Sequence, residues 1–270
     1  MLYLNPNPKT NKIMTWNFIM GIISTIALFL PIIFILTLRL GAYRTFPALL
    51  GYYVIAFINN FLGEQYINTN NQVIKYCGLA NNLLDAPVML LFLIYFCTSA
   101  LQARRMRLLI LSFILFEITV VLLMGFSKQA ITIILAPGLL LVVGFCLIFF
   151  IRQAKMAIVH GKATGKALIS ASLFFAYGCY FIIYLMYYIF ESHVSADKTI
   201  QQEYIDDTFL VYFFVATISS ILLCAGIFIE SKRVQKLNEL KVTRKELSAI
   251  YDGTETAAGL RTATLDFDRD

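Results

Sequence analysis

The stretch Gly78–Phe96, GLANNLLDAPVMLLFLIYF, decides the fold because it is apolar enough to enter a bilayer and yet carries a carboxylate. A helix of about 20 such residues crosses a hydrocarbon core roughly 30 Å thick. Asp85 within that helix is costly unless it meets a partner or water, so it is a hypothesis for a functional site. Asn81 and Asn82 share its helix face, and Pro87 predicts a bend.

The whole chain has the composition of a membrane protein. Its 270 residues are 59% hydrophobic and only 14% charged, which excludes a soluble globular chain. Backbone groups in lipid must be satisfied within the membrane, and the period-2 alternation of a β-barrel is missing from the sequence. We therefore predict an all-α, polytopic membrane protein with seven transmembrane helices, over 16–38, 47–66, 77–99, 107–126, 130–151, 167–190 and 208–229.

The distribution of basic residues predicts the orientation of these helices. Of the 22 Lys and Arg residues, 17 fall on the side of the membrane that holds the C-terminus and five on the other. Because basic loops stay in the cytoplasm, we expect the N-terminus outside and the C-terminus in the cytoplasm. The net charge of +6 is then explained by topology and by attraction to membrane lipids, and no nucleic-acid partner is expected.

The sequence divides into four predicted parts. Residues 1–15 are an extracytoplasmic leader, and 16–229 form the transmembrane domain. Residues 230–252 lack Pro and are rich in helix formers, so they should continue the last span as a signal or linker helix. Residues 253–270 are a flexible tail or the start of a further domain. Heptad spacing along the linker helix is shared by Leu237, Leu240, Leu247 and Tyr251.

The C-terminal tail carries two short motifs. Leu247, Ile250, Tyr251 and Asp252 form an L-x-x-I-Y-D segment, and Leu265–Arg269 reads LDFDR. Together they resemble the entry to a PAS domain. That resemblance implies the membrane sensor module of a bacterial PAS-linked receptor, similar to a sensor histidine kinase, in the bacterial cytoplasmic membrane. It further implies a homodimer and a cytoplasmic signalling domain or partner.

Polar and aromatic side chains around Asp85 predict a ligand site. We expect an outward-facing cavity for a small or lipid-like ligand, since intramembrane carboxylates mark such sites and tyrosine faces can hold cations. The alternatives are hydrogen bonds that hold helices together and simple aromatic packing. The predicted ligand-binding residues are Asn60, Glu64, Asn81, Asn82, Asp85, Tyr180, Tyr184 and Tyr187.

Glu117 is a second acid within a predicted span, about ten residues from either end. At that depth it should be protonated or hydrogen-bonded between helices. A proton-coupling role and a role in helix packing remain equally open.

Other site classes lack their residues. No Lys lies within any predicted span, so a retinal Schiff base has no attachment point and no cofactor is expected. The five cysteines are scattered without a CxxC pair, which implies neither a metal nor a disulfide. Motifs for hydrolases and phosphate-binding loops are missing, so the chain is not expected to be an enzyme.

Three functions fit this pattern. The first is a membrane sensor that relays ligand binding through the seventh helix to a cytoplasmic output. The second is a small-molecule transporter or proton-coupled permease that uses Asp85 and Glu117. The third is a scaffold subunit in which the polar residues only hold helices together.

Overall fold

The computed structural model describes all residues except 1–15, 64–69, 161–162, 193–197 and 252–270, together with some side chains near helix ends. Within this part of the chain, seven helices are long and apolar enough to cross a membrane, which confirms the predicted all-α, seven-helix architecture. The elements are α1 (Trp16–Thr37), η1 (Leu40–Ala42), α2 (Phe46–Gly63), α3 (Asn71–Leu93), η2 (Ile94–Phe96), α4 (Ala100–Met124), α5 (Lys128–His160), α6 (Thr164–Ser192) and α7 (Lys198–Tyr251).

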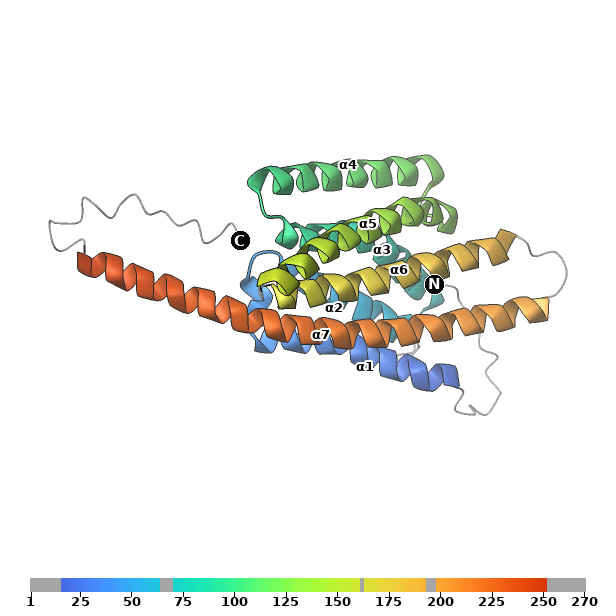
Figure 1. Cartoon of the computed structure of the whole chain (residues 1–270). Helices are drawn as coiled ribbons and strands as arrows, with labels where there is room; N and C mark the ends of the chain where they lie inside the picture. The colour runs from blue at the N-terminus through green and yellow to red at the C-terminus, as the bar shows by residue number, and fades with distance from the viewer. Residues whose placement is uncertain (1–15, 64–69, 161–162, 193–197, 252–270) are drawn as a thin grey trace.

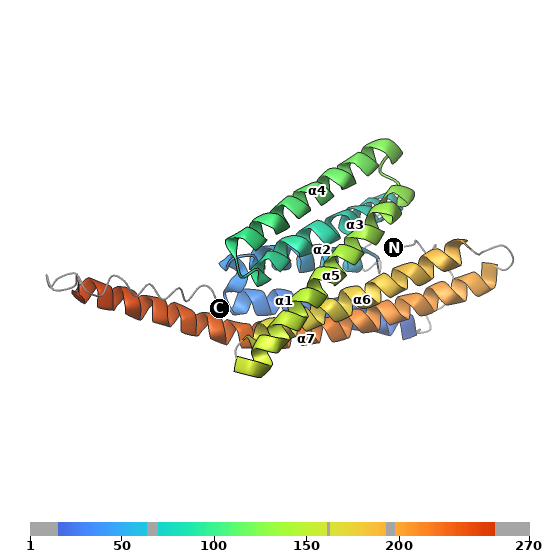
Figure 2. The same ribbon diagram turned by 45° about the horizontal axis from the view of Figure 1, so that its top comes forward.

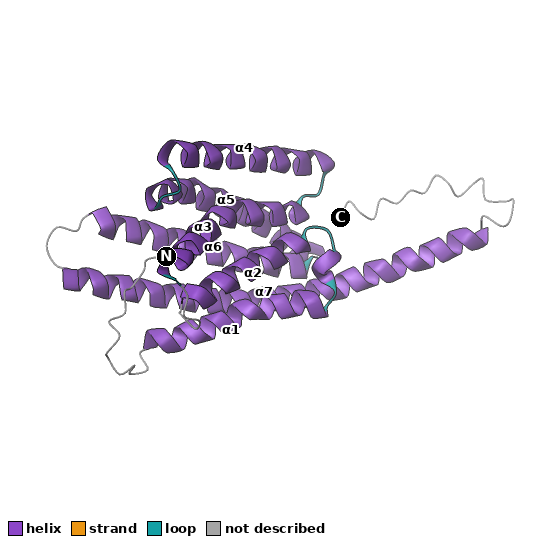
Figure 3. Cartoon of the chain, turned by 180° about the vertical axis from the view of Figure 1, so that it is seen from behind, coloured by secondary structure: helices purple, strands orange, loops and turns teal. Residues whose placement is uncertain are grey.

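The helices form an elongated bundle in which sequence order only partly sets the neighbours (Figure 1). Helix α3 packs against α2 and α5, and α6 packs between α5 and α7. The first helix lies beside the last, since α1 packs along α7 as well as α2. Helix α4 lies at one edge, where it contacts α3 and α5 (Figure 2). Figure 3 shows the bundle from behind, and in this view α1 and α2 lie on the side that faces the viewer.

The edge helix α4 presents an apolar face away from the bundle. Leu108, Leu111, Leu115 and Leu122 on this helix are all exposed, Leu122 by 80%. Large apolar side chains are costly to expose to water, whereas lipid chains are as apolar as leucine. The helix surface therefore fits a lipid environment, and the chain is an integral membrane protein.

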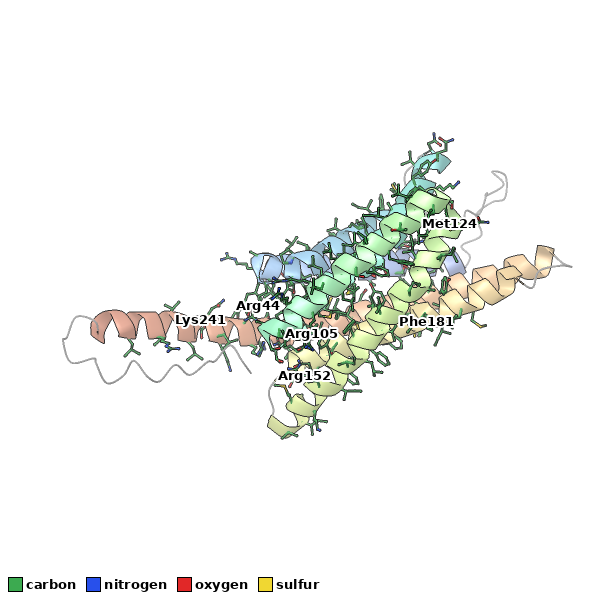
Figure 4. The ribbon with its side chains drawn as sticks, turned by 90° about the horizontal axis from the view of Figure 1, so that it is seen from above. Arg44, Arg105, Met124, Arg152, Phe181 and Lys241 are labelled. Carbon is green, nitrogen blue, oxygen red and sulfur yellow. The ribbon has the colours of Figure 1, made fainter. Side chains whose placement is uncertain are left out.

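One end of the bundle gathers basic side chains, and we call it the basic end. The connections from α1 to α2, α3 to α4 and α5 to α6 all lie there, and Figure 4 shows Arg44, Arg105 and Arg152 at this end. Hydrogen bonds fix these connections: the Thr45 hydroxyl donates to the Phe92 carbonyl at 3.1 Å. The Arg152 guanidinium donates to Gln102 Oε1 at 3.3 Å. The first bond ties the connection between α1 and α2 to α3, and the second links α5 to the start of α4.

Helix α7 extends beyond the bundle at the basic end (Figure 1). Its 54 residues run without interruption from Lys198 to Tyr251, so the predicted span 208–229 and most of the predicted linker 230–252 belong to one helix. Within the bundle, the buried Ser172 hydroxyl of α6 donates to the Ser219 carbonyl of α7 at 2.7 Å. A rigid rod of this kind can carry a displacement from the bundle to residues outside it.

Candidate functional site

Asp85 of α3 has a direct partner on α6. The Tyr177 hydroxyl donates a hydrogen bond to Asp85 Oδ1 at 3.1 Å. Tyr177 is only 1% exposed, whereas Asp85 keeps part of its surface accessible. The Tyr52 hydroxyl is a second hydrogen-bond partner of this carboxylate. Two oxygens have about four lone-pair positions, so Asp85 still has acceptor capacity for a further donor.

Four more tyrosines surround this pair, and we call the five together the tyrosine cluster. Its rings form a continuous series, with centroid separations of 5.2 Å for Tyr52–Tyr53 and 6.4 Å for Tyr52–Tyr177. The series continues at 5.9 Å for Tyr177–Tyr180 and 5.3 Å for Tyr180–Tyr212. These are contact distances for aromatic pairs. The cluster therefore joins α2, α6 and α7 around the carboxylate on α3.

The chemistry of the cluster suits a cation. Tyr52, Tyr53, Tyr180 and Tyr212 all lie close enough to Asp85 to interact with its charge. A carboxylate supplies an ion pair, and aromatic faces attract ammonium groups by their quadrupole. Phenol hydroxyls add donors and acceptors at fixed positions. This combination can hold a small molecule that has a positive charge and an apolar body.

Asp85 lies close to the middle of the candidate span of α3. Helix α3 begins at Asn71, and its candidate span covers Gln72–Phe96. Asp85 is therefore about 20 Å along the helix axis from Gln72 and close to the middle of the span. The predicted span began later, at residue 77, because polar residues before it lower the local hydropathy. The candidate span therefore puts Asp85 nearer the middle of its helix than the predicted bounds 77–99 do.

The predicted ligand-binding residues do not all meet at Asp85. Tyr180 belongs to the tyrosine cluster, and Asn81 and Asn82 are partly exposed on α3 one turn before Asp85. Asn60 instead faces α1, where its amide donates to Thr25 Oγ1 at 2.8 Å. The Tyr184 hydroxyl donates to the Thr132 carbonyl of α5 at 2.9 Å.

Two of the predicted site residues lie outside what the structure describes. Glu64 falls in the segment 64–69, and the side chain of Tyr187 is also beyond the described atoms. The predicted ligand-binding residues omitted Tyr52, Tyr53, Tyr177 and Tyr212, which the structure brings to the cluster. The available signal was a tyrosine inside each of the apolar runs of α2 and α7, where a phenol hydroxyl needs a partner.

Glu117 is buried in α4 and separate from the tyrosine cluster. It is 5% exposed, and its Oε1 has no hydrogen-bond partner among the described residues. One turn earlier on α4, Phe113 meets Gly138 of α5. A Cβ on Gly138 would lie 2.9 Å from the Ala86 Cβ of α3, so this glycine permits three helices to meet beside Asp85.

The described part of the chain can be searched for metal ligands and for lysines within the spans. In that part of the chain, no group of three His, Cys, Asp or Glu side chains could hold a metal. The candidate span of α6 begins at Thr164 rather than at 167, so Lys166 lies inside it. The predicted exclusion of a retinal Schiff base therefore applies only to the narrower bounds taken from the sequence.

Comparison with known proteins finds no matching family, no matching curated protein and no matching solved structure.

Proposed function

We propose that this integral membrane protein is a receptor that binds a small cationic or lipid-like ligand at Asp85 and relays binding through α7. One observation carries the proposal: the tyrosine cluster around a mid-span carboxylate includes Tyr212 of α7, and the same helix continues to Tyr251. Tyr251 is 39 residues beyond Tyr212, or about 58 Å along a helix. A ligand that displaces the Tyr180–Tyr212 contact would therefore move a long rigid element.

The direction of signalling follows from the charge distribution. The basic end would face the cytoplasm by the positive-inside rule, which leaves the N-terminus outside. The extension of α7 then enters the cytoplasm, where Leu240 and Leu247 are exposed at heptad spacing. This face suits a homodimer, and the resemblance of the tail to a PAS entry supports a cytoplasmic signalling partner in a bacterial membrane.

The receptor proposal is tested with simple ammonium probes. The purified full chain is heated with tetramethylammonium, tetraethylammonium or choline, and unfolding is followed for the natural chain and for Asp85→Asn. We expect at least one probe to raise the unfolding temperature of the natural chain and not that of the variant. Glu239→Gln is the matched control, because it neutralises an exposed carboxylate on the extension of α7, outside the tyrosine cluster. Equal responses of natural chain and Asp85→Asn would contradict the site.

The relay has its own readout. Hydrogen exchange of residues 230–251 is measured in lipid nanodiscs with and without the stabilising probe. We expect protection of this segment to change in the natural chain and to stay constant in Asp85→Asn. Binding without any change in the segment would leave a ligand site but remove the receptor function.

A transporter is the second candidate, and the buried Glu117 favours it. Two carboxylates, Asp85 and Glu117, lie in helices joined by the close contact at Gly138. Intramembrane acids of this kind form proton relays in transporters. Uptake of the same ammonium probes into proteoliposomes under a proton gradient, abolished by Glu117→Gln, would replace the receptor by a proton-coupled permease.

A further inference from the structure

A further buried carboxylate lies at the basic end, well apart in sequence from Asp85 and Glu117. Glu230 of α7 is 0% exposed. The Tyr95 hydroxyl of η2 donates to its Oε1. The Arg233 guanidinium donates to the same oxygen at 2.7 Å and to Oε2 at 3.2 Å. The carboxylate is therefore already neutralised and hydrogen-bonded by its own neighbours.

Lys166 of α6 lies beside this group, but its ammonium makes no ion pair with Glu230 in the described structure. Its ammonium lies over the Tyr95 ring, 5.0 Å from the centroid. It makes no hydrogen bond or ion pair with any residue that the structure describes. Arg44, Arg152 and Arg233 all lie close enough to repel it. Three arginines and one carboxylate, Glu230, thus lie near Lys166, and the Lys166 ammonium donates to none of the described residues.

Backbone packing holds Lys166 in this position. A Cβ on the preceding Gly165 would lie 2.7 Å from the Glu230 nitrogen, so α6 and α7 are in contact here. On the other side, the Arg44 guanidinium lies 5.7 Å from the Tyr43 ring, and Tyr43 meets Tyr95 edge-on at 6.3 Å. The cations are therefore set on a fixed aromatic and backbone frame. Figure 4 shows Arg44 and Arg152 at the same end of the bundle.

We infer that this basic cluster (Arg44, Arg152, Lys166 and Arg233) binds a phosphate group, carried by an anionic lipid or present as free phosphate. Lysine binds phosphate as a point charge, and arginine offers a planar set of donors. Lys166 and its partner Tyr95 lie where the candidate span of α3 ends, at Phe96, and where that of α6 begins, at Thr164, which is where lipid headgroups would meet the protein. A phosphate would give the Lys166 ammonium its acceptor and offset the excess of positive charge. This inference is independent of the receptor proposal.

The test measures lipid retention and affinity on the full chain. The protein in detergent is titrated with phosphatidylglycerol, phosphatidylcholine or inorganic phosphate, and bound adducts are counted by native mass spectrometry. We expect an anionic species to bind the natural chain more tightly than phosphatidylcholine. Loss of one cation near a lipid surface should weaken that binding about fivefold, and we expect this loss for Lys166→Gln.

Two further variants make the result decisive. Lys155→Gln removes an exposed cation from the same end of α5 and should leave the affinity unchanged. Arg44→Asn removes a cluster cation from an exposed position. The φ of Arg44 is 47°, a left-handed conformation that Asn tolerates. It should therefore fold and bind about fivefold more weakly even if Lys166→Gln does not fold.

The species that binds identifies the source of the phosphate. Binding of phosphatidylglycerol alone assigns a lipid headgroup, and competition by inorganic phosphate assigns the free anion. Equal binding of phosphatidylcholine and phosphatidylglycerol with no binding of phosphate overturns the inference. So does an equal loss in Lys155→Gln and Arg44→Asn.

Discussion

Replacing Tyr177 by Phe removes one hydroxyl and keeps the ring. The ring would still contact Tyr52 at 6.4 Å and Tyr180 at 5.9 Å, so packing in the cluster is retained. The substitution removes the hydrogen bond from the Tyr177 hydroxyl to Asp85 Oδ1 and the contact of the same hydroxyl with that of Tyr52. A double-mutant cycle with Asp85→Ala isolates the free energy of the contact between Tyr177 and Asp85, since neither variant supplies a replacement donor or acceptor.

The length of the bond sets the expected magnitude. At 3.1 Å it is at the long end for an O–H···O bond, whose usual range is about 2.5–3.0 Å. Interhelical hydrogen bonds in membranes contribute about 0.6 kcal/mol on average and about 1.7 kcal/mol at most. A bond to a charged group typically contributes about 1.5–3 kcal/mol. We expect a coupling free energy of about 0.6 kcal/mol, as for an ordinary interhelical bond.

The assay is reversible unfolding of the full chain in mixed lipid–SDS micelles. Tyr184→Phe is the matched control, because its hydroxyl donates to the Thr132 carbonyl and lies two turns further along α6. Its coupling with Asp85→Ala should be zero within about 0.5 kcal/mol. Equal coupling for Tyr177→Phe and Tyr184→Phe would refute the contact. A coupling above about 1.7 kcal/mol would exceed the interhelical range and indicate a charged Asp85 in the resting protein.

Three further substitutions test the packing around this site by the same unfolding assay. Gly138→Ala should lower the free energy of unfolding by about 1–3 kcal/mol, because the new Cβ would overlap α3; Gly144→Ala, with open space around it, should not lower it. Asn60→Ala should cost about 0.6–1.7 kcal/mol, since its amide is bonded to Thr25; no loss would mean that the bond is not formed. Glu117→Leu should raise the free energy of unfolding, because Oε1 is buried without a partner among the described residues; a decrease would reveal a partner for the acid.

The helices themselves could be predicted because lipid leaves the backbone little choice. Apolar runs of sufficient length must be hydrogen-bonded internally, so each of the seven predicted spans corresponds to a helix of the structure. The bounds differ where a helix continues into polar sequence. Helix α5 extends to His160 rather than 151, and α3 begins at Asn71 rather than 77. Hydropathy detects the membrane core and not the ends of a helix.

The contacts between helices could be predicted only in part. The cost of a buried charge identifies Asp85 from the sequence, and the tyrosines at 180, 184 and 187 indicate an aromatic face on the predicted span 167–190. The partners on α2 and α7 depend on which faces meet, and helix neighbours in the bundle do not follow from hydropathy. Glu230 was placed in the linker helix because the apolar run ends at 229. The structure buries Glu230 fully. Tyr95 of η2 and Arg233 of α7 donate hydrogen bonds that compensate for the burial of its charge.

The pairing of the first helix with the last has a consequence for biogenesis. Helix α1 packs along α7, so its contact face is not covered until α7 has been made. The ribosome needs roughly 10–40 s to synthesise the chain from Thr37 to Arg244, at about 5–20 residues per second. During that time α1 lies in the membrane without its contact to α7, and its buried Ser24 and Thr25 hydroxyls bond the Gly21 carbonyl of α1 and the Asn60 amide of α2. Assembly of the bundle is therefore completed late, and translation arrest before α7 leaves a partly assembled membrane protein for quality control to remove.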